Sequence, residues 1–318
     1  MLSLWFIAIS AIVPAPSMAQ DYPSRPVRLV VASGPGGSTD NLARILGERL
    51  SEGWKQPLVF DNRPGAGGIL AGETVAKGSP DGHTLLFSTS AAIAVSVSLY
   101  GKLPYDPVRD FAPIVHVASQ PYMLISHPAS VSSVKELIAA AKANPGQISF
   151  SHTGAGTGTH LAGELFMRAA QVKLLSVPYK SIGQSMTAVL SGETQLTFTS
   201  VYTAWTQART GRAKALAVTG KSRSPAAPQV PTMAEAGLAN YVAGNWYGLL
   251  APAGTPRAIL ESINARVNTA LKRPETKERL IAQGFEPTGG SSDEFGRFIR
   301  SEIKEYAALV KSAGLKVQ

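Results

Sequence analysis

The chain has 318 residues, 44% of them hydrophobic, which is enough apolar material for one large or two smaller globular domains. It contains no cysteine, so disulfides, thiol catalysis, zinc–cysteine sites and iron–sulfur clusters are excluded. The net charge is +9, but Lys and Arg are scattered without the basic stripe and interleaved aromatics typical of nucleic-acid binding. We interpret the charge as a basic surface that favours anionic small molecules.

The N-terminus has the pattern of a secretory signal peptide. Residues 4–13 form an apolar run that is too short to span a bilayer, and Ser17-Met18-Ala19 supplies a small-x-small cleavage pattern. We therefore expect residues 1–19 to be a signal peptide and the protein to be exported to the periplasm. No Lys or Arg precedes the apolar run, so either the true start lies upstream or the free amino terminus supplies the positive charge.

Strands and helices alternate from Val27 onward, which predicts a parallel βαβαβ sheet with right-handed crossovers. The helix over 41–54 is indicated by apolar residues at helical spacing, among them Leu42, Ile45 and Leu46. The expected elements are strands at 27–32, 58–60 and 84–87 and helices at 41–54 and 69–76.

A stretch with three prolines, residues 102–113, breaks this pattern, and a second alternating run begins at Tyr122. We interpret that run as a second α/β lobe. Its expected elements are strands at 123–126, 148–151, 174–177, 194–198 and 214–218 and helices at 134–143 and 160–170.

The C-terminal part contains a strand at 246–251 and three helices that begin near Pro256, Pro274 and Ser291. Proline suits the first turn of a helix, where its missing N–H costs nothing. The last helix, 293–313, has an apolar stripe from Phe295 to Val310. We expect these helices to return to the first lobe, which makes that lobe discontinuous.

Each predicted lobe contains a strand, a glycine-rich turn with hydroxyl residues, and a helix start, at 31–40 and 150–160. Glycine lets the backbone approach a ligand, and the N–H groups of a helix N-terminus attract an anion. A single turn of this kind is weak evidence, but two turns in two lobes suggest a clamp for a carboxylate.

The spacing of residues in this sequence does not match the motifs of nucleotide-binding proteins, hydrolases or metal sites. Thr39 and Thr159 stand where a dinucleotide-binding turn needs its last glycine, and Gly220-Lys221-Ser222 lacks the glycine of a P-loop five residues earlier. No serine lies in a G-x-S-x-G motif. His152 and His160 lie eight residues apart across a turn without a third ligand, so we expect no metal site. Since the nucleotide and hydrolase motifs are also missing, we expect no cofactor and no catalytic residue.

Many separate stretches of the mature chain, in order, resemble the substrate-binding proteins of tripartite tricarboxylate transporters, the Bug or TctC-type receptors. The stretches that carry the resemblance are Tyr22-Pro23-Ser24-Arg25-Pro26-Val27-Arg28, Pro35-Gly36-Gly37-Ser38-Thr39-Asp40, Asn62-Arg63-Pro64-Gly65-Ala66-Gly67-Gly68, Pro80-Asp81-Gly82-His83-Thr84-Leu85-Leu86, Leu103-Pro104-Tyr105-Asp106-Pro107, Gly158-Thr159-His160-Leu161, Val177-Pro178-Tyr179-Lys180, Pro231-Thr232-Met233-Ala234-Glu235-Ala236-Gly237 and Trp246-Tyr247-Gly248-Leu249-Leu250.

The resemblance implies an α/β periplasmic-binding-protein type II fold, with two lobes joined by two crossover strands and a ligand cleft between them. Lobe 1 would comprise residues 20–122 plus 244–318, and lobe 2 residues 123–243. The implied function is a monomeric, non-catalytic receptor that captures a small organic mono- or dicarboxylate and delivers it to the membrane subunits of a tripartite tricarboxylate transporter. A secreted enzyme acting on a small carboxylate and a ligand sensor for a signalling partner remain as alternatives.

The resemblance also implies ligand contacts, carried over by position. Thr157, Thr159 and the turn amides would donate to a carboxylate, whereas Asp40 more plausibly holds the turn. The expected ligand-binding residues are Ser33, Gly34, Gly36, Gly37, Thr39, Asp40, Ser88, Thr89, Ser90, Gly154, Thr157, Gly158, Thr159, His160, Tyr179, Lys180 and Ser181.

The chain departs from the family pattern at three places. Ser33 stands where an aromatic residue usually packs on the ligand, and Val97-Ser98 replaces a frequent Asn-Pro. Thr199 stands where an acidic residue is common, which weakens the case for an amino-acid ligand in the cleft. We expect Ser33 to influence ligand specificity most, by leaving room for a bulkier acid.

Overall fold

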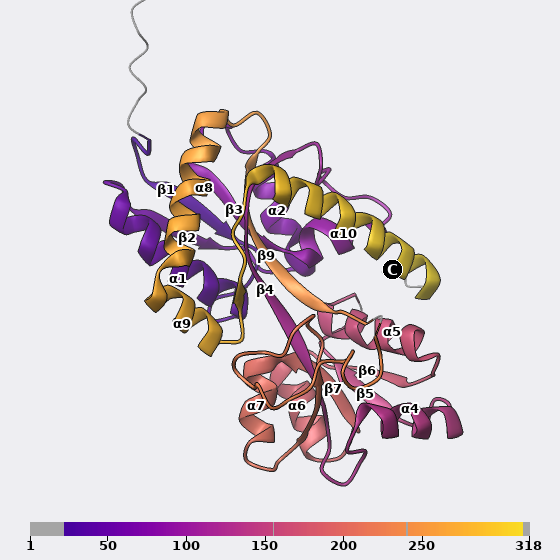
Figure 1. The fold of residues 1–318 in the computed structure, drawn as a ribbon. Coiled ribbons are helices and arrows are strands. Elements are labelled where there is room, and N and C mark those ends of the chain that lie inside the picture. The colour runs from indigo at the N-terminus through magenta and orange to yellow at the C-terminus, as the bar shows by residue number, and fades with distance from the viewer. Residues whose placement is uncertain (1–21, 155, 240, 314–318) are drawn as a thin grey trace, which may run out of the picture.

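The computed structural model describes residues 22–154, 156–239 and 241–313, which form two α/β lobes (Figure 1). The predicted signal peptide over residues 1–19 lies outside the described residues. Within the described part of the chain, no helix is long and apolar enough to cross a membrane.

The long strand β4 (Phe111–Ser126) passes through both lobes. The other strands of the first lobe are β1 (Val27–Val31), β2 (Leu58–Asn62), β3 (Thr84–Thr89), β9 (Gly244–Pro252) and β10 (Glu286–Pro287). Its helices are α1 (Ser38–Gly53), η1 (Ala66–Gly68), α2 (Ile69–Ala76), η2 (Ala91–Val95), α3 (Ser96–Leu99), α8 (Arg257–Lys272), α9 (Pro274–Ala282) and α10 (Ser292–Ala313). The second lobe contains α4 (Val134–Ala143), β5 (Ser149–His152), α5 (Gly158–Ala170), β6 (Leu175–Pro178), α6 (Ile182–Leu190), β7 (Leu196–Ser200), α7 (Val201–Ala208) and β8 (Lys214–Val218).

Hydrogen-bonded strands link the lobes in the order β2-β1-β3-β9-β4-β7-β5-β6, with β8 and β10 added to β4. Residues Phe111 to Pro121 of β4 pair with β9, whereas Tyr122 to Ser126 pair with β7 and β8. The strand therefore changes partners where it passes from one lobe to the other. The predicted α/β architecture with two lobes is confirmed, while the exact lobe boundaries stay a prediction.

The expected strand at 123–126 is too short, because β4 already begins at Phe111 and contains Pro113 and Pro121. Proline lacks an N–H and is tolerated in a sheet at bulges and irregular positions. The register of β4 against β9 shifts between Pro113 and Val115, and again between His116 and Ala118. These irregularities let one strand continue through a proline-containing sequence.

The apolar faces of the first sheet are covered from both sides, as in other α/β folds. One cluster joins α1, α8 and α9 to the sheet through residues such as Leu46 and Val267. The other joins α2, η2 and α10 to the opposite face through Leu86 and Phe295. The predicted return of the three C-terminal helices to the first lobe is therefore confirmed.

Helix α10 also reaches the second lobe (Figure 1). Leu309 and Val310, near its C-terminal end, share a buried cluster with Leu161 of α5 and with Val95 and Leu99 of the first lobe. The same apolar stripe that packs α10 on the first lobe thus provides a contact between the lobes.

Five helical segments were missing from the sequence prediction, namely η1, η2, α3, α6 and α7. Segment η2 is an apolar run, Ala91 to Val95, in which no period distinguishes helix from strand, and α3 follows it directly. Helices α6 and α7 are short, and tertiary packing of their buried faces is what stabilises helices of this length.

Candidate functional site

The two glycine-rich turns face each other from opposite lobes. Strand β4 runs from the first lobe into the second, and β9 is antiparallel to it. Since β3 is antiparallel to β9 and parallel to β1, both β1 and β3 end towards the second lobe. Strand β7 is antiparallel to β4 and parallel to β5, so β5 ends towards the first lobe. The turn after β1 and the turn after β5 therefore each lie at the edge of a sheet that is directed towards the other lobe.

The first turn is held by the buried carboxylate of Asp40, which is 2% exposed. One of its oxygens accepts hydrogen bonds from the Gly36 amide and from Arg44 Nε, both at 2.9 Å. The other accepts a bond of 2.9 Å from Asn62 Nδ2, which also donates to the Ser33 carbonyl at 3.1 Å. Burial alone would raise the pKa of Asp40, but these hydrogen bonds outweigh it and hold the pKa below its usual range. Asp40 is thus an ionised group that shapes the turn.

Asn62 is a member of this network that the sequence analysis did not single out. It is the last residue of β2, and β2 lies beside β1 in parallel, so Asn62 reaches the turn from the neighbouring strand. The sequence did contain a signal for Asn62, because a polar residue at the carboxyl end of a predicted parallel strand lies at the edge where the turns lie.

The second turn is held by two buried histidines. The amide of Gly154 donates to Nδ1 of His152, and the amide of Gly156 donates to Nδ1 of His160, both at 3.1 Å. The two imidazole rings lie 4.4 Å apart between centroids. Both histidines therefore act as hydrogen-bond acceptors inside the turn. No group of metal-binding side chains is found among the described residues.

The environment of His152 keeps it neutral. Burial, together with the neighbouring His160, lowers the pKa of His152 to about 4. Its other ring nitrogen, Nε2, lies 2.8 Å from Ser176 Oγ. A protonated His152 could not accept the Gly154 amide hydrogen, so acid should loosen this turn.

We therefore expect the contribution of His152 to the free energy of unfolding to fall as the pH drops below 6.5. Unfolded His152 takes up a proton near pH 6.5 but folded His152 only near 4, so the stability it contributes is complete above 6.5 and lost as the pH falls towards 4. The expected loss is on the order of 2 kcal/mol. Urea denaturation at pH 7, 5.5 and 4.5 measures it.

The His152→Gln variant should show a shallower pH dependence, whereas the matched control His127→Gln should keep the slope of the unchanged protein. His116, whose pKa burial also lowers to about 4, contributes to the slope that remains. Equal slopes in His152→Gln and the unchanged protein would contradict this role of His152.

The threonines of the second turn also bond within it. The Thr157 hydroxyl donates to the Gly154 carbonyl at 2.7 Å, and Thr159 Oγ1 accepts from the Thr153 amide at 3.1 Å. These hydroxyls fix the shape of the turn, so the backbone N–H groups are the more available donors.

The helices that begin at the two turns have no side-chain cap. Helix α1 starts after Gly37 and α5 after Thr157, and at neither position does a side chain accept a hydrogen bond from the first amides. In contrast, serine side chains cap α4, α6 and α7 at Ser133, Ser181 and Ser200. The first N–H groups of α1 and α5 are therefore available to an external acceptor, and each helix dipole adds positive potential there.

The last residues of β3, and Ser90 directly after it, lie at the same edge of the first sheet as the first turn. Ser88 is fully buried, and its hydroxyl has no hydrogen-bond partner among the described residues. Ser90 Oγ lies 2.6 Å from Asn245 Oδ1 and donates to it. Asn245 belongs to β9, in which Tyr247 donates its hydroxyl hydrogen to Gln120 Oε1 of β4 at 2.7 Å. Ser88 and Ser90 were expected from the sequence, whereas Asn245, Tyr247 and Gln120 were not singled out there.

The expected contacts after β6 are more exposed. The Tyr179 amide donates to the His152 carbonyl at 2.8 Å, which places this loop beside the second turn. The Tyr179 hydroxyl donates to Glu193, and the Ser181 hydroxyl caps α6. Lys180 is exposed at the same edge. Of the expected site residues, those from 33 to 40, 88 to 90, and 154 to 160 thus belong to two facing edges, with 179 to 181 beside the second.

Comparison with known proteins gives one consistent result. The model of the family described as "Tripartite tricarboxylate transporter family receptor" matches residues 42–315. The protein BugT of Bordetella pertussis is 36% identical over 315 residues, covering 98% of this chain and 96% of that protein.

Solved structures are similar over most of the chain. Rpa4515 of R. palustris with adipate is 34% identical with a TM-score of 0.83, and covers 93% of this chain and 100% of its own. MatC of Rhodopseudomonas palustris with bound malate is 30% identical with a TM-score of 0.78, and covers 91% of this chain and 100% of its own.

Proposed function

Because this chain belongs to the tripartite tricarboxylate transporter receptor family, we propose that it captures a small organic carboxylate between its two lobes and delivers it to the membrane subunits of such a transporter. The family is one of periplasmic solute receptors, and two similar structures are described with adipate and with malate. In this proposal the protein is exported to the periplasm, acts as a monomer and performs no catalysis.

The observation that carries the proposal is the pair of facing helix N-termini without side-chain caps, those of α1 and α5. A carboxylate accepts several hydrogen bonds along the directions of its oxygen lone pairs. Backbone N–H groups at a helix start donate such bonds, and the helix dipole adds favourable electrostatics. A ligand held at both helices would contact both lobes, so closing the lobes would bury it.

The size and shape of the ligand would depend on Ser33 and Thr199. Ser33 is half-buried, and its hydroxyl donates to the neighbouring Gly34 carbonyl at 3.2 Å. Thr199 is buried and neutral, and its hydroxyl has no hydrogen-bond partner among the described residues. Without a carboxylate at position 199, an ammonium group there would lack a counter-charge, so we propose an acid without an amino group.

Adipate and malate are expected to raise the melting temperature of the protein in a concentration-dependent way. A ligand that binds only the folded state stabilises it by mass action, by about 2.7 kcal/mol at a concentration of 100 Kd. Thermal unfolding with each acid measures the effect, with 1,6-hexanediol as the uncharged control.

The same mixtures are then analysed by mass spectrometry after prolonged incubation. Recovery of the intact acid together with a thermal shift supports a receptor. Turnover of the acid would overturn the non-catalytic assignment, and the absence of any shift across a series of mono-, di- and tricarboxylates would overturn carboxylate capture.

A further inference from the structure

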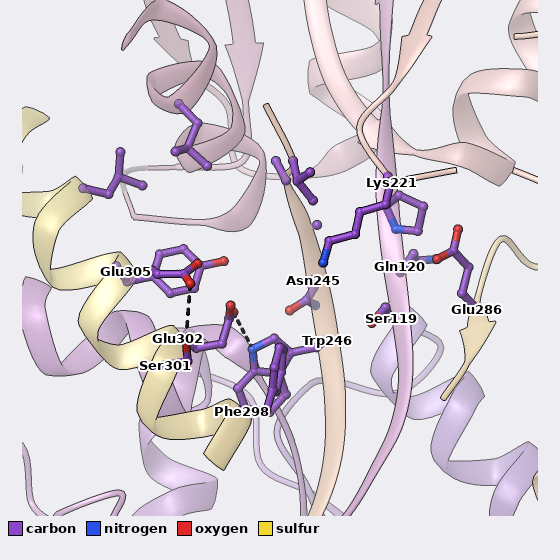
Figure 2. Close-up of a pocket in the computed structure, with 18 of the residues that line it drawn as sticks. Ser119, Gln120, Lys221, Asn245, Trp246, Glu286, Phe298, Ser301, Glu302 and Glu305 are labelled. Carbon is purple, nitrogen blue, oxygen red and sulfur yellow. Dashed lines mark hydrogen bonds between the residues drawn. The ribbon is translucent and has the colours of Figure 1, made fainter. Parts of the chain in front are cut away.

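A cavity lies between α10, the crossover segments of β4 and β9, and the loop that follows β8 (Figure 2). Its volume is about 570 Å³, within the usual range for small-molecule sites. None of the seventeen expected carboxylate contacts lines it. We call it the α10 cavity and define it by Gln120, Lys221, Trp246, Glu302 and Tyr306.

The walls of this cavity come from both lobes. Trp246 of β9 and Glu302 of α10 belong to the first lobe. Leu165 of α5 and Lys221 belong to the second lobe. A molecule that fills the cavity would therefore contact both lobes, and its affinity would depend on how the lobes are arranged.

One side of the cavity is aromatic and apolar. The rings of Trp246 and Phe298 meet edge to face with centroids 5.7 Å apart, and Tyr306 and Leu309 extend this wall along α10. An aromatic face binds hydrocarbon and attracts a cation placed over it.

Glu302, on the same wall, is a partly buried acid without a cationic partner. Its Oε2 accepts a hydrogen bond of 2.9 Å from Trp246 Nε1, and no described Lys, Arg or His forms an ion pair with it. Burial raises the pKa of Glu302 to about 7 despite this hydrogen bond, and the neighbouring Glu305 acts in the same direction. A carboxylate in this environment is stabilised by an ammonium group.

Two further acids, Glu286 and Glu305, and one base, Lys221, also line the cavity. Glu286 of β10 has a carboxylate oxygen, Oε1, that is buried and has no hydrogen-bond partner among the described residues. Lys221 extends from the loop after β8 with its ammonium group directed towards Asn245 (Figure 2). No hydrogen bond or ion pair of Lys221 is formed with the described residues. The cavity thus offers unpaired groups of both charges and an apolar wall.

We propose that the α10 cavity binds a zwitterion with an apolar body, of the class of hydrophobic amino acids, distinct from the carboxylate held at the two turns. Its ammonium group pairs with Glu302, its carboxylate with Lys221, and its side chain packs on Trp246 and Phe298. The requirement for both charges separates this ligand from the one proposed for the turns, which is an acid without an amino group.

The test uses L-phenylalanine, phenethylamine and 3-phenylpropionate as probes in isothermal titration calorimetry. All titrations are made in the Gly37→Val background, in which carboxylate binding at the first turn is expected to be lost. Saturable binding of L-phenylalanine at one site is expected, with weaker binding of each half-ligand, because each lacks one of the two ion pairs.

Two variants test which side chain pairs with each charged group of the ligand. Glu302→Gln keeps an acceptor for Trp246 but loses the charge, and should weaken L-phenylalanine and phenethylamine about tenfold without weakening 3-phenylpropionate. Lys221→Met should weaken L-phenylalanine about threefold, because this lysine is exposed, and should leave phenethylamine unchanged. Glu278→Gln and Lys277→Met on α9, outside the cavity, are matched controls with the same changes in charge.

Absence of saturable L-phenylalanine binding, or equal effects of Glu302→Gln and Glu278→Gln, would overturn the proposal. Adipate and malate binding to the protein with an unchanged Gly37 is measured separately. A result that overturns amino-acid binding in the α10 cavity can therefore be distinguished from one that overturns carboxylate binding at the turns.

Discussion

Gly158→Ala is expected to lower the free energy of unfolding by about 2 kcal/mol and to abolish carboxylate binding. A Cβ atom on Gly158 would lie 2.0 Å from the hydroxyl oxygen of Tyr122 and 3.1 Å from its Cζ. Tyr122 is buried on β4 at the point where the strand changes partners, so it cannot move away without disturbing the packing of both lobes. Helix α5 would have to shift, and its first N–H groups with it. Urea denaturation and titration with adipate measure the two effects.

A second substitution that removes the clashing atom should restore stability to Gly158→Ala. Tyr122→Phe removes the oxygen atom that lies at 2.0 Å, so the double variant Tyr122→Phe/Gly158→Ala should regain most of the lost stability and part of the binding. Gly101→Ala is the matched control, because a Cβ atom there meets nothing within 4 Å. If Gly158→Ala proved as stable as Gly101→Ala, the close packing of the second turn on Tyr122 would be refuted.

Gly37→Val is expected to weaken carboxylate binding at least a hundredfold while changing the free energy of unfolding by less than about 1 kcal/mol. Gly37 is the residue before α1, with φ −74° and ψ 166°, a conformation that valine adopts readily. A Cβ atom there would have as its nearest neighbour the Gly34 carbonyl oxygen at 3.5 Å, which is an ordinary contact. The isopropyl group would instead stand beside the first amides of α1 and keep a carboxylate away from them. Calorimetric titration and thermal unfolding separate binding from stability.

Gly101→Val serves as the control for the size of the added side chain, since it lies in open space away from both turns. Binding in Gly37→Val that equals binding in Gly101→Val would mean that the first turn does not contact the ligand. A large loss of stability in Gly37→Val would instead show that the turn has no room for a side chain.

Much of the fold could be predicted from short-range patterns. The alternation of strands and helices, the glycine-rich turns and the proline at the start of α9 each depend on residues within one or two turns of chain, and the structure has all of them. Strand β4 was predicted too short, because a proline usually ends a strand and the bulges that accommodate Pro113 form only against β9, more than a hundred residues later.

The sequence by itself determined the fold class, the two turns and the residue types at the site. The tertiary structure decided which polar groups at those turns are already used. Asp40 bonds to Asn62, and Ser90 bonds to Asn245, 155 residues away in the chain. It also brought Lys221 and Glu302 to one cavity from separate lobes. The physical reason is that a polar group's availability to a ligand depends on the partners that folding brings within hydrogen-bonding distance, and such partners follow no local period in the sequence.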